Sequence, residues 1–100
     1  TGSEFSFQSF APGTETGFLH THKTHEELYF FLSGCGEFQV DGQVFPVSEG
    51  SVVRVAPAGR RSVRNNGTEP LVMLCIQYRA GTFTTEDATD GDLLQELVKW

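Results

Sequence analysis

The sequence contains little cysteine and no long apolar stretch. Its longest unbroken apolar run is Leu71 to Ile76, far short of the roughly 20 residues that a membrane-spanning helix needs. Cys35 and Cys75 are the only cysteines, and they form no CxxC spacing, which argues against a disulfide framework. We therefore expect no membrane-spanning helix, and free thiols in a reducing compartment, namely the cytoplasm.

Basic residues are also scarce. Seven Lys and Arg residues stand against thirteen Asp and Glu residues, which gives a formal net charge of −6. A protein without a stripe of Lys and Arg is a poor partner for nucleic acid or for an anionic membrane, so we expect neither. Positive charge gathers in one place, where four of the five arginines fall close together: Arg54, Arg60, Arg61 and Arg64.

Turn-forming residues recur at short intervals along the chain. Between the turns lie short segments rich in Val, Phe, Tyr and Thr, a pattern typical of an all-β sandwich or barrel. The Asp41-Gly42 pair suits a type I′ hairpin, because both residue types tolerate positive φ. One domain over residues 1–100 is expected. The predicted strands are roughly 4–10, 17–22, 27–33, 36–41, 43–47, 51–56, 61–65 and 70–79.

The C-terminal tail, residues 84–100, differs from the rest. Five of its residues are acidic, and Leu93, Leu94, Leu97 and Val98 recur at helical spacing. This pattern predicts a short C-terminal helix that packs on the sheet with Trp100 as its anchor. A frayed tail is the alternative, since Gly91 and the acids weaken a helix.

All three histidines fall within six residues. On a strand, side chains at positions i and i+2 point to the same face, so His20 and His22 present two imidazoles side by side. Two imidazoles and a carboxylate from the next strand form a set that suits Fe, Mn, Ni or Zn and leaves open coordination positions. A solvated histidine-rich turn without a metal is the simpler alternative for an isolated His-x-His.

Two spacings in the sequence make the metal interpretation stronger, because together they resemble the two motifs of the cupin superfamily. The first motif runs His-x-His, three or four residues, Glu, six residues and Gly, and it is matched by His20, His22, Glu27 and Gly34. The second motif combines Gly, Pro-x-Gly, His and Asn at set spacings. With one inserted residue, its positions correspond to Gly50, Pro57, Gly59, Ser62 and Asn66.

The resemblance implies a small cupin whose barrel core covers about residues 10–80, a double-stranded β-helix or jelly roll. It also implies that His20, His22 and Glu27 are metal ligands inside the barrel. Ser62 stands at the position of the fourth ligand, and a neutral hydroxyl is a poor substitute for an imidazole. A divalent ion could still bind with three ligands, or His25 could turn inward as an additional ligand.

Further expectations follow from strand alternation and from the resemblance. If Glu27 points inward, Tyr29 does too and is a candidate substrate contact. Both faces of the segment 28–32 are apolar, which requires burial on both sides. Because many small cupins pair across such strands, we expect a homodimer. Arg60 follows the Pro57-Ala58-Gly59 turn, which lies at the barrel mouth in cupins, and is a candidate for holding a substrate anion.

Two functions are consistent with these residues. The first is a metal-dependent enzyme that acts on a small polar or anionic molecule, of the isomerase, dioxygenase or decarboxylase type. The second is a non-catalytic cupin that binds or senses a small molecule with a degenerate metal site. The intact His20, His22 and Glu27 favour the first function, whereas Ser62 favours the second.

Overall fold

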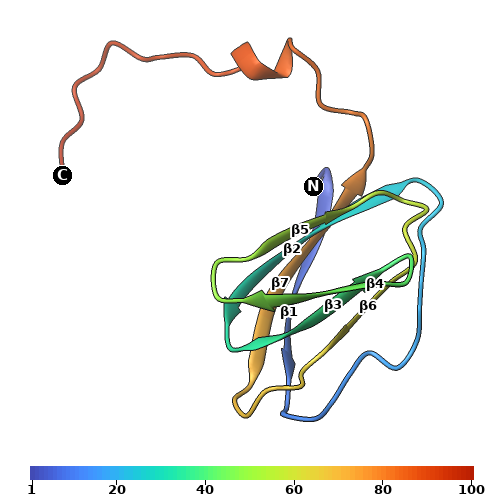
Figure 1. Cartoon of the computed structure of the whole chain (residues 1–100). Coiled ribbons are helices and arrows are strands. Elements are labelled where there is room, and N and C mark those ends of the chain that lie inside the picture. The colour runs from blue at the N-terminus through green and yellow to red at the C-terminus, as the bar shows by residue number, and fades with distance from the viewer.

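The computed structural model describes residues 1–100 and contains seven strands (Figure 1). A single turn of 3₁₀ helix, η1, is the only helical element. The predicted all-β architecture is therefore confirmed. The strands are β1 (Ser3–Phe10), β2 (His25–Ser33), β3 (Cys35–Val40), β4 (Gln43–Ser48), β5 (Val52–Val55), β6 (Arg61–Arg64) and β7 (Leu71–Arg79), followed by η1 (Asp87–Thr89).

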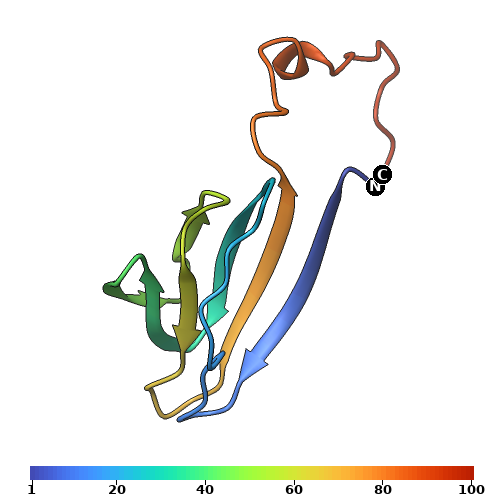
Figure 2. The same cartoon turned by 90° about the vertical axis from the view of Figure 1, so that its right-hand side faces the viewer.

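The strands form two antiparallel sheets that face each other. One sheet has four strands in the order β1-β7-β2-β5, and the other has three strands in the order β4-β3-β6. Figure 2 shows the smaller sheet on one side of β2 and β7, with β1 at the outer edge of the larger sheet. Strands that are distant in sequence are neighbours in both sheets, as a jelly roll requires.

The core lies between the inner faces of the two sheets. Along β2, the side chains of Glu27, Tyr29 and Phe31 point inward and are at most 5% exposed, as the period of two predicts. The ring of Tyr29 meets the ring of Phe38 edge-on, with centroids 4.8 Å apart, so β2 and β3 are joined across the barrel. The buried apolar core consists of Tyr29, Phe31, Phe38, Val47, Val55, Val63, Leu71, Met73 and Cys75.

The Asp41-Gly42 hairpin forms where it was predicted, between β3 and β4. Both residues have positive φ, +50° and +83°, as a type I′ turn needs. The turn places Phe38 opposite Phe45 on the inner face of the smaller sheet. The hairpin therefore sets the register of the sheet that carries part of the functional site.

The predicted strand over 17–22 is wrong. Residues 11–24, here called the strap, run beside β6 in an extended path but pair with it at only two bridges, Glu15 with Arg64 and His20 with Arg61. The register shifts by two residues between these bridges. Gly17 lies in this interval with φ +82°, a left-handed conformation that interrupts a ladder. The strap is therefore an irregular extra edge of the smaller sheet.

The predicted short C-terminal helix, packed on the sheet within the tail 84–100, is also wrong. Only Asp87–Thr89 form a helical turn, and all residues from Gly81 to Trp100 are exposed. Trp100 anchors nothing. Four leucine and valine side chains at helical spacing do not fold into a helix without a surface to cover them. No helix of the structure has the length and apolar character that would let it cross a membrane.

Candidate metal centre

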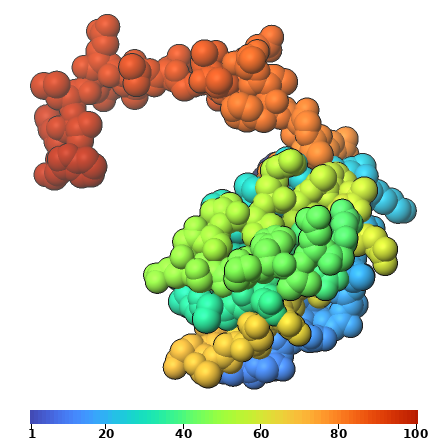
Figure 3. All heavy atoms as spheres, viewed as in Figure 1, coloured from blue at the N-terminus to red at the C-terminus, as the bar shows by residue number.

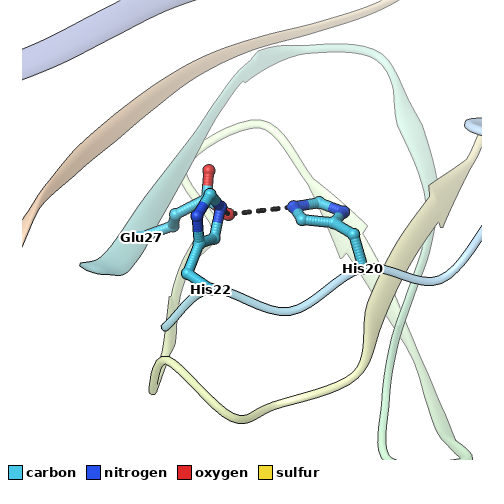
Figure 4. Close-up of side chains that lie close together, drawn as sticks. All are labelled: His20, His22 and Glu27. Carbon is cyan, nitrogen blue, oxygen red and sulfur yellow. Dashed lines mark hydrogen bonds and ion pairs between the residues drawn. The ribbon is translucent and has the colours of Figure 1, made fainter. Parts of the chain in front are cut away.

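Two of the predicted ligands lie on the strap and the third lies on β2. The main chain of His20 exchanges both hydrogen bonds with Arg61, and the N–H of His22 donates to the carbonyl of Pro57 at 2.8 Å. These bonds hold the strap against β6 and the turn before it. They turn both imidazoles toward the carboxylate of Glu27 at one end of the barrel, as Figure 4 shows.

The three side chains form a compact group, here called the cage. His20 Nε2 lies 3.1 Å and His22 Nε2 lies 2.9 Å from the same oxygen, Glu27 Oε1. All three potential ligand atoms lie within 4.8 Å of one another. Glu27 is buried, whereas the side chains of His20 and His22 are 34% and 27% exposed. The cage therefore opens to solvent on the histidine side.

Arg61 completes the cage in place of the residue expected there. Its guanidinium is 1% exposed and places Nη1 2.5 Å from Glu27 Oε1. The other guanidinium nitrogens donate to the carbonyls of Ala56, Pro57 and Gly59. Four hydrogen bonds and burial fix this cation at the carboxylate. The barrel position that the motif assigns to a fourth ligand is thus held by a guanidinium, which has no lone pair to offer a metal.

Arg61, and not Ser62, reaches Glu27, so the structure does not support the assignment of the fourth-ligand position to Ser62. Inward and outward side chains alternate along β6, and Arg61 and Val63 are the buried pair. Ser62 lies opposite Gln39 and lines a groove of about 420 Å³ between the strap and the smaller sheet. One signal in the sequence could have revealed this. Counted back from Asn65 instead of Asn66, the three-residue spacing of the second motif ends on Arg61.

Asn65 itself supports this count. It is 1% exposed, and its amide donates to the carbonyls of Phe10 and Glu69, while its Oδ1 accepts from the N–H of Gly67. These three bonds join the end of β6 to β1 and to the connection that leads into β7. Asn65 is therefore a buried structural residue, whereas Asn66 is exposed.

The charge of Glu27 is strongly stabilised. Burial raises the pKa of its carboxyl group, but the hydrogen bonds from Cys75, Arg61, Tyr29 and His20 outweigh this effect and lower the pKa to about 2. Oε2 accepts from the thiol of Cys75 at 3.0 Å, and Oε1 accepts from the hydroxyl of Tyr29 at 2.9 Å. Glu27 is therefore an anion at neutral pH, with donors on both oxygens.

Tyr29 and Cys75 stay protonated beside this anion. Burial and the charge of Glu27 raise the pKa of the Tyr29 hydroxyl far above its usual range. Burial and the hydrogen bond to Glu27 likewise raise the pKa of the Cys75 thiol to about 12. Neither group is a base at neutral pH. Both orient Glu27, and Tyr29, which is 4% exposed, lies behind the carboxylate.

Two other candidates lie outside the cage. His25 is the first residue of β2, and its Nδ1 pairs with Gln77 Oε1 at 2.8 Å. Arg60 is exposed, and its backbone N–H donates to Asp41 Oδ1 at 2.9 Å. The chain thus brings together His20, His22 and Glu27. The arginine that lies at this group is Arg61, whereas the sequence suggested Arg60 as the arginine near the ligand.

The donor set of the cage fits one divalent ion with three ligands. Two imidazole nitrogens and one carboxylate oxygen are typical ligands of Zn, Fe, Mn and Ni. A cavity of about 50 Å³ adjoins His20 and Arg61, which suits water molecules rather than an organic ligand. A larger molecule therefore has to approach from the exposed side of the two histidines.

One atom of the cage fits a metal less well. Nδ1 of His20 is buried and has no hydrogen-bond partner, whereas a metal-bound histidine ordinarily donates its other N–H to a carbonyl, a carboxylate or water. With Nε2 as a ligand, the proton of a neutral His20 would sit on this unpartnered Nδ1. The protein therefore does not support that tautomer with a hydrogen bond.

Comparison with known proteins identifies the family and the residues that match it. A family model described as the cupin domain matches residues 6–77. An uncharacterized protein from Methanocaldococcus jannaschii is 37% identical over 60% of this chain and 48% of its own length. An oxalate-binding protein from Thermotoga maritima is 31% identical over 72% of this chain and 59% of its own length. The chain thus spans between about half and three-fifths of these curated relatives.

A solved structure resembles nearly the whole chain. The crystal structure of a cupin protein from Bacteroides fragilis is 36% identical and superposes with a TM-score of 0.89, over 94% of this chain and 80% of that one. Because residues 1–83 make up only 83 of the 100 residues, the aligned part includes at least 11 residues of the tail 84–100. The likeness therefore extends beyond the two sheets.

Proposed function

The chain belongs to the cupin family, and on that premise we propose that it binds a small anionic molecule on a divalent ion held by His20, His22 and Glu27. The observation that carries this proposal is the convergence of three ligand atoms within 4.8 Å. When bound, such an ion supplies a Lewis acid with positions free for a carboxylate, an enolate or O₂. Isomerase, dioxygenase and decarboxylase chemistry all begin from this kind of complex.

The residues around the cage suit an anionic ligand. Arg61 balances the charge of Glu27, so a divalent ion in the cage would leave a net positive site. The oxalate-binding relative from Thermotoga maritima gives the proposal a specific example, a short dicarboxylate. We therefore take short carboxylates as the ligand class.

The roles of the other residues follow from their contacts. Arg61, Tyr29 and Cys75 keep Glu27 ionised and fixed in orientation. His20 and His22 face the solvent side, where the ligand enters. Arg61 cannot hold the ligand directly, because four hydrogen bonds already engage its buried guanidinium. Its role in the proposed function is to position Glu27.

A second candidate function is supported by the Arg61–Glu27 pair and by the unpartnered Nδ1 of His20. In this version no metal binds. Glu27 already has donors on both oxygens, and the partly exposed imidazoles of His20 and His22 bind an anion by hydrogen bonds, without catalysis. This function uses the same opening and the same ligand class but differs in its dependence on metal.

Calorimetry on the protein purified without a histidine tag or chelator separates the two functions. We expect one Mn²⁺, Ni²⁺ or Zn²⁺ per chain in wild type, no binding in His20→Ala, and unchanged binding in His25→Ala, a matched control beside the cage. Oxalate should then bind only to the metal-loaded protein. Equal oxalate binding with and without metal would establish the second function, and absence of both metal and oxalate binding would refute both.

A further inference from the structure

The C-terminal tail, residues 84–100, makes no backbone hydrogen bond to the barrel that precedes it and is here called the arm. Every residue of the arm is exposed, and its backbone hydrogen bonds all stay within residues 84–90. Figure 3 shows the arm projecting from the barrel as a separate limb. The radius of gyration is 16.8 Å, whereas a compact chain of this length has about 13 Å.

The arm carries five of the thirteen large apolar side chains that are exposed in this protein. Leu93, Leu94 and Leu97 are 100%, 78% and 89% exposed, and Val98 and Trp100 are 71% and 111% exposed. Five large apolar groups within eight residues are unfavourable in water. Groups of this kind that lie together on a soluble protein mark a contact surface.

A second uncovered apolar surface lies on the outer face of the larger sheet, here called the outer face. The strand register aligns two rows of side chains across all four strands on this face, and seven of the eight are apolar. The rows are Phe5, Ile76, Leu28 and Arg54, and Phe7, Leu74, Phe30 and Val52. Phe5, Phe7 and Val52 are 60%, 69% and 55% exposed, so nothing in the single chain covers this face.

The two surfaces lie on the same side of the molecule but do not touch. In Figure 2 the arm leaves β7, passes over the end of the larger sheet and continues on the side away from the smaller sheet, the side that the outer face looks toward. The aligned crystal structure from Bacteroides fragilis includes at least 11 arm residues.

We propose that two copies of this chain pair through their outer faces and that each arm lies on the outer face of its partner, with its leucines and Trp100 against the phenylalanine rows. A second copy is the occupant that fits, because each chain supplies both halves of the contact. In a two-fold symmetric dimer the contact between an arm and an outer face then forms twice, once in each direction. The acidic residues of the arm remain at the rim, where Arg54 ends one of the rows.

Paired variants test this exchange. Leu94→Asp/Leu97→Asp removes the arm contact without touching the barrel, since both side chains are exposed in the single chain. Phe7→Asp removes the receiving surface, and Val44→Asp is the control, because Val44 is 51% exposed on the opposite sheet. Light scattering should give about 22 kDa, twice the 11.0 kDa chain mass, for wild type and Val44→Asp. The arm variant should dissociate at least about 100-fold more readily.

Mixing provides the decisive measurement. Phe7→Asp retains a functional arm and Leu94→Asp/Leu97→Asp retains a functional face, so a mixture of these two monomers should form a heterodimer detectable by native mass spectrometry. Thermal melts of both variants exclude unfolding as the cause of dissociation. The proposal is overturned if wild type is a monomer, if the arm variant dimerises like wild type, or if the mixture of folded variants stays monomeric.

Discussion

Arg61 and Glu27 form an ion pair inside the barrel, with Nη1 and Oε1 2.5 Å apart and side chains that are 1% and 6% exposed. Burying either charge alone would be costly, because the interior solvates ions poorly. The pair keeps both charges in place, and it lies directly behind the two histidines. Much of the chemistry of this site therefore depends on one arginine.

Replacing Arg61 by Met should destabilise the protein strongly. The substitution removes the cation and leaves the Glu27 carboxylate buried without its main partner, which typically costs about 3–5 kcal/mol of unfolding free energy. Urea denaturation monitored by circular dichroism measures the loss. The matched control is Arg60→Met, whose exposed side chain predicts a change within about 0.5 kcal/mol. Equal stabilities for the two variants would contradict a structural role for the ion pair.

Replacing Arg61 by His should strengthen metal binding. The change removes a positive charge from the cage and adds an imidazole at the inward position of β6, so affinity for Zn²⁺ or Ni²⁺ should rise by about 10-fold or more. Ser62→His should leave the affinity unchanged, because position 62 faces the outside of the sheet. Calorimetric titration compares the two variants.

The control for this experiment is His20→Ala in the Arg61→His background, which should abolish the gain. A gain in Ser62→His rather than in Arg61→His would show that the register of β6 differs from that described above.

The two cysteines should differ sharply in reactivity. Cys35 is exposed, whereas Cys75 is buried and its thiol donates a hydrogen bond to Glu27. Burial and this hydrogen bond raise the pKa of the Cys75 thiol to about 12. A raised pKa lowers the thiolate fraction at every pH below it, and the thiolate is the reactive form. Ellman's reagent at pH 8 should therefore label one thiol per native chain quickly and the second only in urea. Rapid labelling of two thiols in the folded protein would refute this prediction.

Much of the fold could be predicted from local pattern. Alternation along β2 correctly placed Tyr29 on the inward side together with Glu27, because a buried face constrains every second residue. The Asp41-Gly42 turn could also be predicted, because few residue pairs accept two positive φ values. These features depend on short-range geometry, which the sequence carries directly.

The wrong predictions concern segments whose structure depends on which residues of distant strands pair with each other. The segment 17–22 looks like a strand, but Gly17 and the shifted pairing with β6 break its ladder. Ser62 was placed in the site by counting along a motif, and an error of one residue exchanges the two faces of a strand. Besides the count back from Asn65, the pairing of β6 with β3 distinguishes Arg61 from Ser62. The spacing of the leucines in the arm indicates an apolar face, but it carries no information about the surface that covers this face.

The strap is attached to the barrel along one side only. Binding of a ligand in the cage should therefore slow the local opening of the strap. From Gly13 to His22, its long-range main-chain bonds reach only β6, Asn65 and Pro57, so it can detach while the barrel stays folded. Detachment carries both imidazoles away from Glu27 at once. A molecule held by both imidazoles must therefore leave before the strap opens, and its binding free energy adds to the free energy of opening. Hydrogen–deuterium exchange at the amides of His20 and His22 thus measures occupancy of the cage.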